Sequence, residues 1–359
     1  MHLRRLWLTD FRGYREADVA FDPGLTAVVG ANGQGKTNLL EAIGYLATLA
    51  SFRGAPTDAL IRQGAERAVV RAEGDRDGRS LLLEAELVAG GRNRAQLNRQ
   101  PLRRARDLLG ALRVTVFSPD DLALVKSGPG ERRTYLDDTL VALHPRNDQA
   151  RADLDRILRQ RAALLKQAGG RLTAEVELTL DVFDAKLVAA GEALAQARAE
   201  LVVELEPILA AAYDRVAGRP AEVHATYEPP WRAEGLAAAL AASRRDDLRR
   251  GVSTVGPHRD DLDLAIGDLP SRTHASQGEQ RSLALALRLA AHEVVTRRTE
   301  TPPVLLLDDV FSELDPERSD ALLHSLPAGQ TVLSTAGALP SGAVPGALLR
   351  VDGGVVRPD

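Results

Sequence analysis

Residues 28–50 read VVGANGQGKTNLLEAIGYLATLA, and this stretch decides how the rest of the chain is interpreted. An apolar strand candidate, residues 25–29, comes before a glycine-rich loop, and apolar residues at helical spacing follow the loop. The loop fits the pattern G-x-x-x-x-G-K-[ST] through Gly30, Gly33, Gly35, Lys36 and Thr37. Glycines let such a loop turn its N–H groups toward phosphate oxygens, and the following helix adds the positive end of its dipole. A chance glycine-rich turn is the alternative, and the flanking strand and helix disfavour it.

The loop predicts a site for a nucleoside triphosphate. Lys36 would reach the β and γ phosphates, and the Thr37 hydroxyl would complete the shell of a Mg²⁺ ion. The candidate nucleotide-binding residues of the loop are Gly30, Ala31, Asn32, Gly33, Gln34, Gly35, Lys36, Thr37 and Asn38.

A second candidate half-site lies at residues 302–316, PPVLLLDDVFSELDP. The apolar run of residues 304–307 is typical of a buried parallel strand, and two carboxylates follow it. At the carboxyl edge of an open sheet they would lie beside the phosphate loop of a neighbouring strand. Asp308 is then expected on the Mg²⁺ side, and Asp309 is expected to orient or deprotonate the attacking water. Alone, an apolar strand followed by acids is common; the pairing with the loop at Gly30 favours the functional interpretation.

Composition limits the class of protein. The chain has 359 residues, which is enough for more than one domain or lobe, and its aromatic content of 4% leaves the core to Leu, Val and Ala. The absence of Cys excludes disulfides and thiolate metal sites and suits a reducing cytoplasm. No apolar run reaches membrane-spanning length. A net charge of −4 gives no global sign of a polyanionic partner, so any nucleic-acid surface must be a local patch.

Residues 274–295, HASQGEQRSLALALRLAAHEVV, predict a helix from Ser282 onward, with SQGEQ as a loop and first turn. Ser276 with Glu279 three residues later fits an ordinary capping box. A helix N-terminus is also an anion site, so a capping role and a phosphate-binding role can hold together.

In chain order, GANGQGKT, SQGEQ, VLLLDD and SELD resemble the Walker A, signature, Walker B and D-loop motifs of ABC-type ATPase heads. The resemblance implies that ATP is the nucleotide and that two heads dimerise head to tail. The signature of one head then caps the ATP held by the other, so that Ser276, Gly278 and Gln280 would act in trans. The catalytic candidates are accordingly Lys36, Ser276 and Asp309.

The segment DFRGY followed by GLTAVVGANGQGKTNLLEAI resembles DNA-repair and SMC-type heads, and within them the RecF family of bacterial recombination mediators. VFSPDDLALVKSGPGERRTYLDD, GPHRDDLDL and LLLDDVFSELD are also similar to RecF. The resemblance implies an α/β, P-loop ABC-type ATPase head, with a mixed β-sheet and helices, in residues 1–118 and 251–359. Residues 119–250 show helical periodicity, for example at Leu154 and Ile157, broken at Gly169, and have room for a compact helical arm but not for a long coiled coil.

Three positions depart from the general ABC pattern. Asp309 stands where Glu is usual, and its shorter reach predicts slow hydrolysis. Thr335 stands where transporter cassettes have a switch histidine. No Q-loop glutamine follows the strand predicted at 113–117, which leaves Asp120 or Asp121 as candidates.

An arginine patch, residues 91–106, is the candidate DNA surface and holds no acidic residue. Its members are Arg92, Arg94, Arg99, Arg103, Arg104 and Arg106. If four to six of them neutralise phosphates, log K should fall with log[salt] with a slope of roughly −4 to −5. A solvated basic hairpin is the alternative. No aromatic residue is interleaved, so binding should not depend on base stacking or sequence.

Two further positions carry expectations. Arg12, in DFRGY, is a candidate nucleotide contact because related heads approach the nucleotide there. GPHRDD, residues 256–261, resembles a metal cluster, but we interpret it as structural because adjacent residues rarely converge on one ion.

The resemblance implies an ATP-dependent homodimer that clamps duplex DNA near single-stranded gaps and releases it on slow, DNA-stimulated ATP hydrolysis. The implied partners are DNA, RecR, RecO and, indirectly, RecA, with a cytoplasmic, nucleoid-associated location and no membrane. A structural clamp with incidental hydrolysis stays open as the alternative. A transporter cassette is disfavoured by the arginine patch, by Thr335 and by the helical arm.

Overall fold

The computed structural model describes residues 1–359, apart from the side chain of Glu313. The chain forms two compact units. The first unit consists of Met1–Leu122, Ile208–Ala221 and Gln277–Asp359, and the second unit of Ala123–Pro207 and Glu222–Ser276. Helix α6, Ala174–Ala217, contributes residues to both units, and the division falls at Pro207, inside the helix. A proline there cannot donate the backbone hydrogen bond of a regular helix.

The first unit contains two six-stranded sheets, of which the first is antiparallel in the order β2-β1-β4-β5-β6-β7. Buried and more exposed residues alternate along β4, as expected for a sheet with one face against a core and one in solvent. Its strands are β1 His2–Phe11, β2 Tyr14–Ala20, β4 Arg67–Arg76, β5 Arg79–Val88, β6 Arg94–Leu97 and β7 Gln100–Pro101.

The second sheet has the order β15-β14-β3-β13-β12-β8, and all its strands pair in parallel except β15 with β14. Its strands are β3 Leu25–Val29, β8 Val114–Phe117, β12 Val304–Asp308, β13 Thr331–Thr335, β14 Ala347–Asp352 and β15 Val355–Pro358. Every residue of β12 and β13 is buried, as expected for strands covered on both faces. The strands predicted at 25–29 and 304–307 are confirmed.

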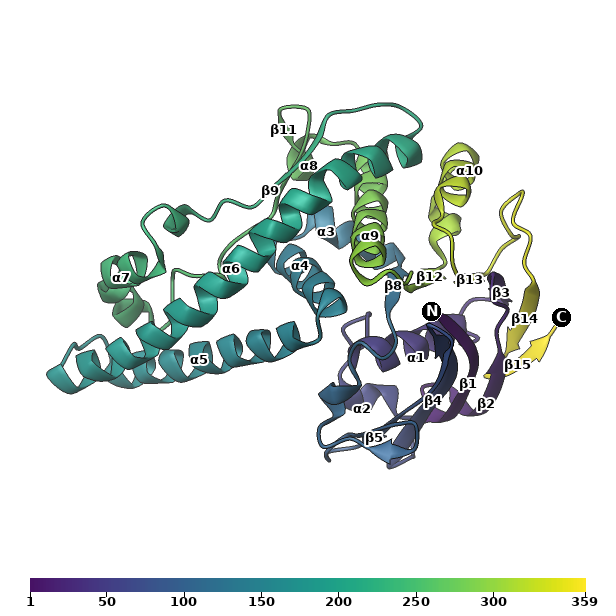
Figure 1. Ribbon diagram of the computed structural model, residues 1–359, viewed down its shortest axis with the longest axis horizontal. Helices are drawn as coiled ribbons and strands as arrows, with labels where there is room; N and C mark the ends of the chain where they lie inside the picture. The colour runs from purple at the N-terminus through teal and green to yellow at the C-terminus, as the bar shows by residue number, and fades with distance from the viewer. The chain divides into compact units, whose positions relative to one another are not determined.

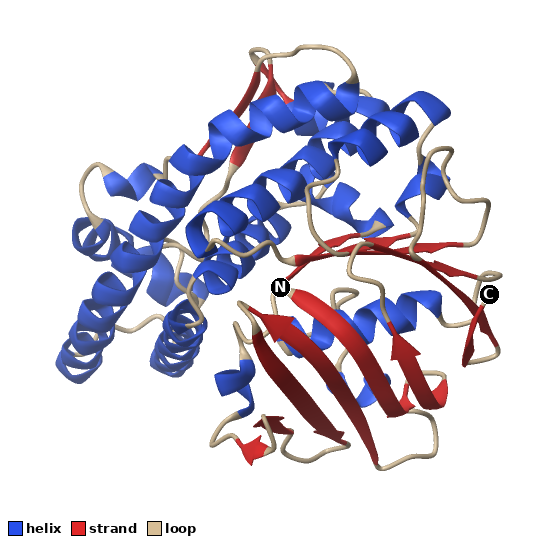
Figure 2. Cartoon of the chain, turned by 45° about the vertical axis from the view of Figure 1, so that its right-hand side comes forward, coloured by secondary structure: helices blue, strands red, loops and turns tan.

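Helix α1, Lys36–Thr48, lies between the two sheets (Figure 2). Residues 39–47 of α1 are all buried, because one side of the helix packs on each sheet. Helix α9, Gln277–Thr299, lies on the other side of the second sheet and contacts β8 (Figure 1). Gln330 joins the sheets: its Oε1 accepts from Leu3 N at 2.6 Å and its Nε2 donates to Leu3 O at 2.6 Å. The unit is completed by α2 Thr57–Leu60, α10 Pro316–Ser325 and the short turns η1 Ala105–Leu108, η2 Pro119–Leu122 and η4 Val310–Glu313.

The second unit is mainly helical. Helix α5, Arg146–Ala168, ends at the left-handed Gly169, as the sequence predicted. Leu165, Leu180 and Leu248 form a small core between α5, α6 and α7. The other elements are α3 Ala123–Lys126, α4 Pro129–Leu143, α7 Leu236–Arg250, α8 Ser271–His274, η3 Pro230–Arg232 and a sheet of β9 Val223–Thr226, β10 Asp263–Ile266 and β11 Leu269–Pro270.

The two units differ from the predicted arm, residues 119–250, in three places, of which the smallest is residues 119–122, grouped with the first unit. Residues 208–221 group with the first unit, where Leu209, Ala212, Tyr213 and Val216 are buried. Residues 251–276 group with the second unit, because β10 pairs with β9 along four residues. Helical periodicity shows that a segment is a helix but not which core it packs against, so the sequence could not assign either segment.

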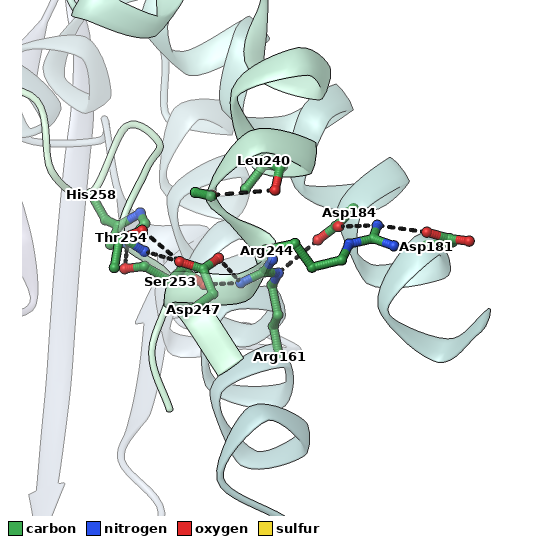
Figure 3. Close-up of polar contacts among 10 residues, drawn as sticks. Arg161, Asp181, Asp184, Leu240, Arg244, Asp247, Ser253, Thr254 and His258 are labelled. Carbon is green, nitrogen blue, oxygen red and sulfur yellow. Dashed lines mark hydrogen bonds and ion pairs between the residues drawn. The ribbon is translucent and has the colours of Figure 1, made fainter. Parts of the chain in front are cut away.

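A buried ion-pair network holds the helices of the second unit together (Figure 3). The Arg161 side chain is fully buried and donates to Asp184 at 2.7 Å, Asp247 at 2.7 Å and Ser253 at 2.9 Å. Arg244 donates to the second oxygen of Asp184 at 2.8 Å. The network therefore links α5, α6 and α7 to the chain that follows α7.

The polar side chains of GPHRDD contact different partners. His258 Nε2 lies 3.0 Å from Ser253 O, and Asp260 accepts hydrogen bonds from Tyr227 and Trp231. Asp261 pairs with Arg132 at 2.7 Å. Among the side chains that the structure describes, no group of three or more His, Cys, Asp or Glu is arranged to hold a metal ion. These contacts agree with the structural interpretation of the segment. In the described part of the chain, no helix combines the length and apolar character needed to cross a membrane.

Candidate nucleotide-binding site and arginine patch

The phosphate loop, residues 30–37, connects β3 to α1 at the carboxyl edge of the second sheet. Two of its glycines are required by their surroundings. A Cβ on Gly30 would lie 2.3 Å from Val351 O, and one on Gly35, whose φ is 116°, would lie 3.0 Å from the Tyr14 hydroxyl. The loop conformation is therefore available only to the glycines that the motif supplies.

Neighbouring strands hold the loop from outside. Tyr14 Oη donates to Gly35 O at 2.9 Å. Gln34 Oε1 accepts from Gly353 N at 2.6 Å, and Gln34 O accepts from Gly354 N at 3.3 Å, so the turn between β14 and β15 is bonded to the loop. Gln34 was predicted to contact the nucleotide; in this structure its side chain is bonded to that turn.

Lys36 and Thr37 point into the site. Lys36 is 5% exposed, and its Nζ donates to Ala31 O at 2.9 Å, so the ammonium group lies inside the curve of the loop. Thr37 Oγ1 donates to Asp308 Oδ1 at 2.9 Å, although 271 positions separate the two residues. Ser334 Oγ donates to the same carboxylate oxygen at 2.7 Å. The structure thus brings together the two predicted metal-binding residues.

This arrangement fits Mg²⁺. Burial, the largest effect, raises the pKa of Asp308, and the hydrogen bonds from Ser334 and Thr37 oppose that rise. One carboxylate and one hydroxyl are too few ligands for a site made of protein alone, but Mg²⁺ usually takes one or two carboxylates and completes its shell with phosphates and waters.

Asp309 has an unusual backbone and an unpaired oxygen. Its φ of 49° and ψ of 27° lie in the left-handed region, and its N–H donates to Ser334 O at 3.1 Å. Its Oδ1 is shielded from solvent and has no hydrogen-bond partner among the described residues. Strained backbone and unpaired buried polar atoms are both costly and tend to occur at functional sites.

Arg12 is held in an ion pair. Its guanidinium donates to both carboxylate oxygens of Glu41, at 2.8 and 2.7 Å, and to Ala59 O at 2.9 Å. Glu41 is fully buried in α1, and the Ser51 hydroxyl donates to the same carboxylate. The predicted nucleotide contact of Arg12 would have to share the guanidinium with Glu41.

One cation near the site, Arg53, belongs to no recognisable motif. Arg53 is exposed in the loop after α1, and its charge weakly opposes the rise that burial causes in the pKa of Asp308. Its N–H donates to the Ser51 hydroxyl at 3.1 Å, which fixes its loop near Glu41. The isolated arginine in SFRG was the only sequence signal.

The signature segment, residues 276–280, lies at the start of α9. Ser276 is exposed, Gly278 is partly exposed and Gln280 is 4% exposed. Ser276 and Gly278 are therefore accessible to a second molecule, whereas the Gln280 side chain lies in the interior. A direct nucleotide contact by Gln280 would require it to turn outward.

Two other predicted positions, Thr335 and Asp121, are buried. Thr335 is buried at the end of β13, and its hydroxyl accepts from Gly337 N at 3.1 Å. Asp121 is buried and pairs with Arg288 at 2.7 Å, so of the two candidates for the Q-loop position only Asp120 is exposed.

The arginine patch follows the hairpin of β6 and β7. Arg106 is partly buried and the other five arginines are exposed. Three of the patch arginines line a surface cavity of about 460 Å³ together with Glu84 and Glu86 of β5. Arg94 lies 3.6 Å from Glu86, so the surface around the patch carries negative charge that residues 91–106 alone do not show. The acidic residues come from the neighbouring strand, and a linear stretch could not reveal them.

Comparison with known proteins places the chain in a family. The family model for the RecF/RecN/SMC N-terminal domain matches residues 2–333. Proteins called DNA replication and repair protein RecF are similar over 94% of this chain and 93% of their own length: 46% identical over 352 residues in Streptomyces avermitilis and 48% over 354 residues in Frankia alni.

Solved structures of two proteins match the fold of this chain over nearly its whole length. A structure of the recombination mediator protein RecF with ATP, in the RecFOR pathway, matches with a TM-score of 0.91 and 28% identity, over 100% of this chain and 97% of that one. An Smc head domain from Pyrococcus furiosus matches with a TM-score of 0.59 and 17% identity, over 99% and 95% of the two chains, and shows the shared fold. The phosphate loop, the Thr37–Asp308 pair and these relatives together show that the chain belongs to the RecF family and has the α/β, P-loop ABC-type ATPase fold.

Proposed function

We propose that this protein is an ATP-dependent DNA-binding protein of recombinational repair, in which ATP drives a head-to-tail dimer that clamps duplex DNA near single-stranded gaps. The observation that carries the proposal is the hydrogen bond between Thr37 and Asp308, which joins the phosphate loop to the Walker B strand. ATP with Mg²⁺ is the ligand that this pair fits, and the relatives include a RecF structure with ATP.

Each residue of the site has a separate proposed role. Lys36 exchanges its bond to Ala31 O for the phosphates of ATP, so the loop binds the chain of phosphates through one ammonium group and several N–H groups. Bound Mg²⁺ would neutralise phosphate charge at Thr37 and Asp308. Asp309 would hold the attacking water and accept its proton, for which its shielded, unpaired Oδ1 must first turn toward the phosphates. The short reach of Asp makes hydrolysis slow.

Dimerisation follows from differential binding. The terminal phosphate held by one copy contacts Ser276 and Gly278 of a second copy only when the two are closed head to tail. ATP therefore stabilises the closed dimer, and hydrolysis removes that stabilisation and releases DNA. The accessibility of both residues supports this role.

The arginine patch is the proposed DNA surface, because its five exposed arginines can neutralise phosphates without reading bases. DNA held there would stimulate hydrolysis by favouring the closed dimer. Since relatives belong to the RecFOR pathway, we further propose that this protein acts with RecR and RecO in the cytoplasm, on nucleoid DNA, to promote the loading of RecA.

The first test is the solution mass by light scattering, with and without ATP and Mg²⁺, each repeated with a short gapped duplex. A monomer that becomes a dimer only with ATP, and then retains DNA, is the expected result. Lys36→Met should bind neither nucleotide nor a second copy. A wild-type protein that stays monomeric in ATP, or holds DNA equally well without nucleotide, would show that the proposed clamp is wrong.

The alternative is a structural ATP-gated clamp with incidental hydrolysis. The observation that favours it is Asp309, whose side chain is one methylene shorter than the usual Glu. In that case blocking hydrolysis would leave DNA release unchanged.

A further inference from the structure

Arg318 lies against the signature glycine of its own unit. Arg318 is in the first turn of α10, and Asp315, the last residue of the D-loop, caps that helix by accepting from Arg318 N at 2.8 Å. The same carboxylate accepts from Arg318 Nη1 at 2.6 Å. A Cβ on Gly278 would lie 2.7 Å from Arg318 Nη2 and 3.0 Å from its Cζ. The guanidinium therefore rests on the backbone of Gly278, and a side chain at that position would have to displace it.

The positive charge at this contact is only partly neutralised by the carboxylate of Asp315. Gly278 is in the first turn of α9, whose N-terminus carries positive charge and disfavours a nearby cation. Arg318 Nε is shielded from solvent and has no hydrogen-bond partner in the described part of the chain. Glu279, the acidic residue of that turn, is paired with Arg219 at 2.5 Å. Asp315 therefore offsets only part of the positive charge.

We propose that Arg318 is part of the surface that receives the terminal phosphate of a nucleoside triphosphate held by a second copy of this chain. Its Nη2 would bind the phosphate beside the N–H groups at Gly278, and its Nε would become available when the side chain turns outward. This proposal rests on the head-to-tail dimer of the proposed function. The contact would also let the surface distinguish a nucleoside triphosphate from a diphosphate, because the diphosphate lacks the terminal phosphate that would reach Arg318.

A purely structural role predicts little effect of removing the charge. The Arg318–Asp315 pair is an exposed i,i+3 contact, with 35% and 47% of the side chains accessible, and such pairs contribute little to stability. Dimerisation and folding can therefore be separated in a variant.

The test compares Arg318→Gln with Arg297→Gln, which removes an equally small exposed ion pair at the far end of α9. At low protein concentration, where only monomer is present, both variants should bind ATP as the wild type does. The dissociation constant of the ATP-bound dimer should rise at least about tenfold in Arg318→Gln and stay unchanged in Arg297→Gln. Arg318→Lys, which keeps the charge, should recover part of the loss.

A double-mutant cycle between Arg318 and Gly278, measured on the dissociation constant of the ATP-bound dimer, gives a second test. Gly278→Ala should weaken the dimer by displacing the guanidinium, and should weaken it much less when Arg318 is already Ala. A normal ATP-bound dimer in Arg318→Gln, or weaker ATP binding by its monomer, would overturn the role of Arg318 while the proposed function stands. A wild type that does not dimerise in ATP would overturn both.

Discussion

Replacing Asp247 by Ala should destabilise the second unit strongly. Asp247 is fully buried and accepts from Arg161 Nη1 at 2.7 Å, from Thr254 N at 2.8 Å and from Thr254 Oγ1 at 2.5 Å. The substitution leaves the Arg161 guanidinium buried with Asp184 as its remaining carboxylate partner, and the Thr254 N–H loses its acceptor.

The magnitude follows from the burial of the pair. Arg161 Nη2 already has no partner among the described residues, so the guanidinium cannot compensate locally. Breaking a buried ion pair by removing one member costs about 3–5 kcal/mol of the free energy of unfolding. The neighbouring residue provides the control. Asp246 is 55% exposed and pairs with the exposed Arg249, so Asp246→Ala should cost at most about 1 kcal/mol.

Urea unfolding followed by tryptophan fluorescence can measure the difference. The chain has two tryptophans, Trp7 in the first unit and Trp231 in the second, so a Trp7→Phe background makes Trp231 the only reporter. Trp231 is buried and donates to Asp260, and its emission should change when the second unit unfolds. Equal midpoints and slopes for the two alanine variants would refute the reasoning that the buried network stabilises the unit.

Three further results are expected. Asp309→Asn should lower the single-turnover rate of ATP hydrolysis about 100-fold or more, because a general base is lost, and a rate equal to the wild type would sink that role. Arg103→Glu with Arg104→Glu should weaken DNA binding and reduce the salt slope by about 2 while ATP affinity is kept, and an unchanged slope would move the DNA site elsewhere. Burial lowers the pKa of His292 to about 4 against 6.5 in the unfolded chain, so the folded state excludes a proton that the unfolded state binds. The free energy of unfolding should therefore fall by about 3 kcal/mol from pH 6.5 to pH 4, and less in His292→Gln; parallel pH profiles from urea titrations would contradict this.

The sequence predicts those parts of the site that depend on local patterns. The strand before Gly30 and the strand ending at Asp308 are apolar runs, and parallel strands in an open sheet place their carboxyl ends together. That rule was sufficient to predict the proximity of Thr37 and Asp308, which the structure confirms.

What the sequence could not predict depends on long-range partners. The burial of Gln280, the Arg12–Glu41 pair and the acidic neighbours of Arg94 each involve residues on other elements. Residues 208–217 continue helix α6, and a proline at position 207 does not by itself show that the residues after it pack against a different core.

The position of β3 in its sheet has a consequence for biosynthesis. Leu25–Val29 pairs on one side with β13 and on the other with β14, both of which are more than 300 positions later. During translation β3 and the phosphate loop after it therefore lack both neighbouring strands, β13 and β14, until Ala347–Asp352 has left the ribosome. Pairings of such large sequence separation form slowly, and exposed strand edges aggregate in the meantime. A nascent chain should therefore acquire affinity for ATP only after residues 347–352 have been synthesised, so that nucleotide binding indicates that the first unit has folded.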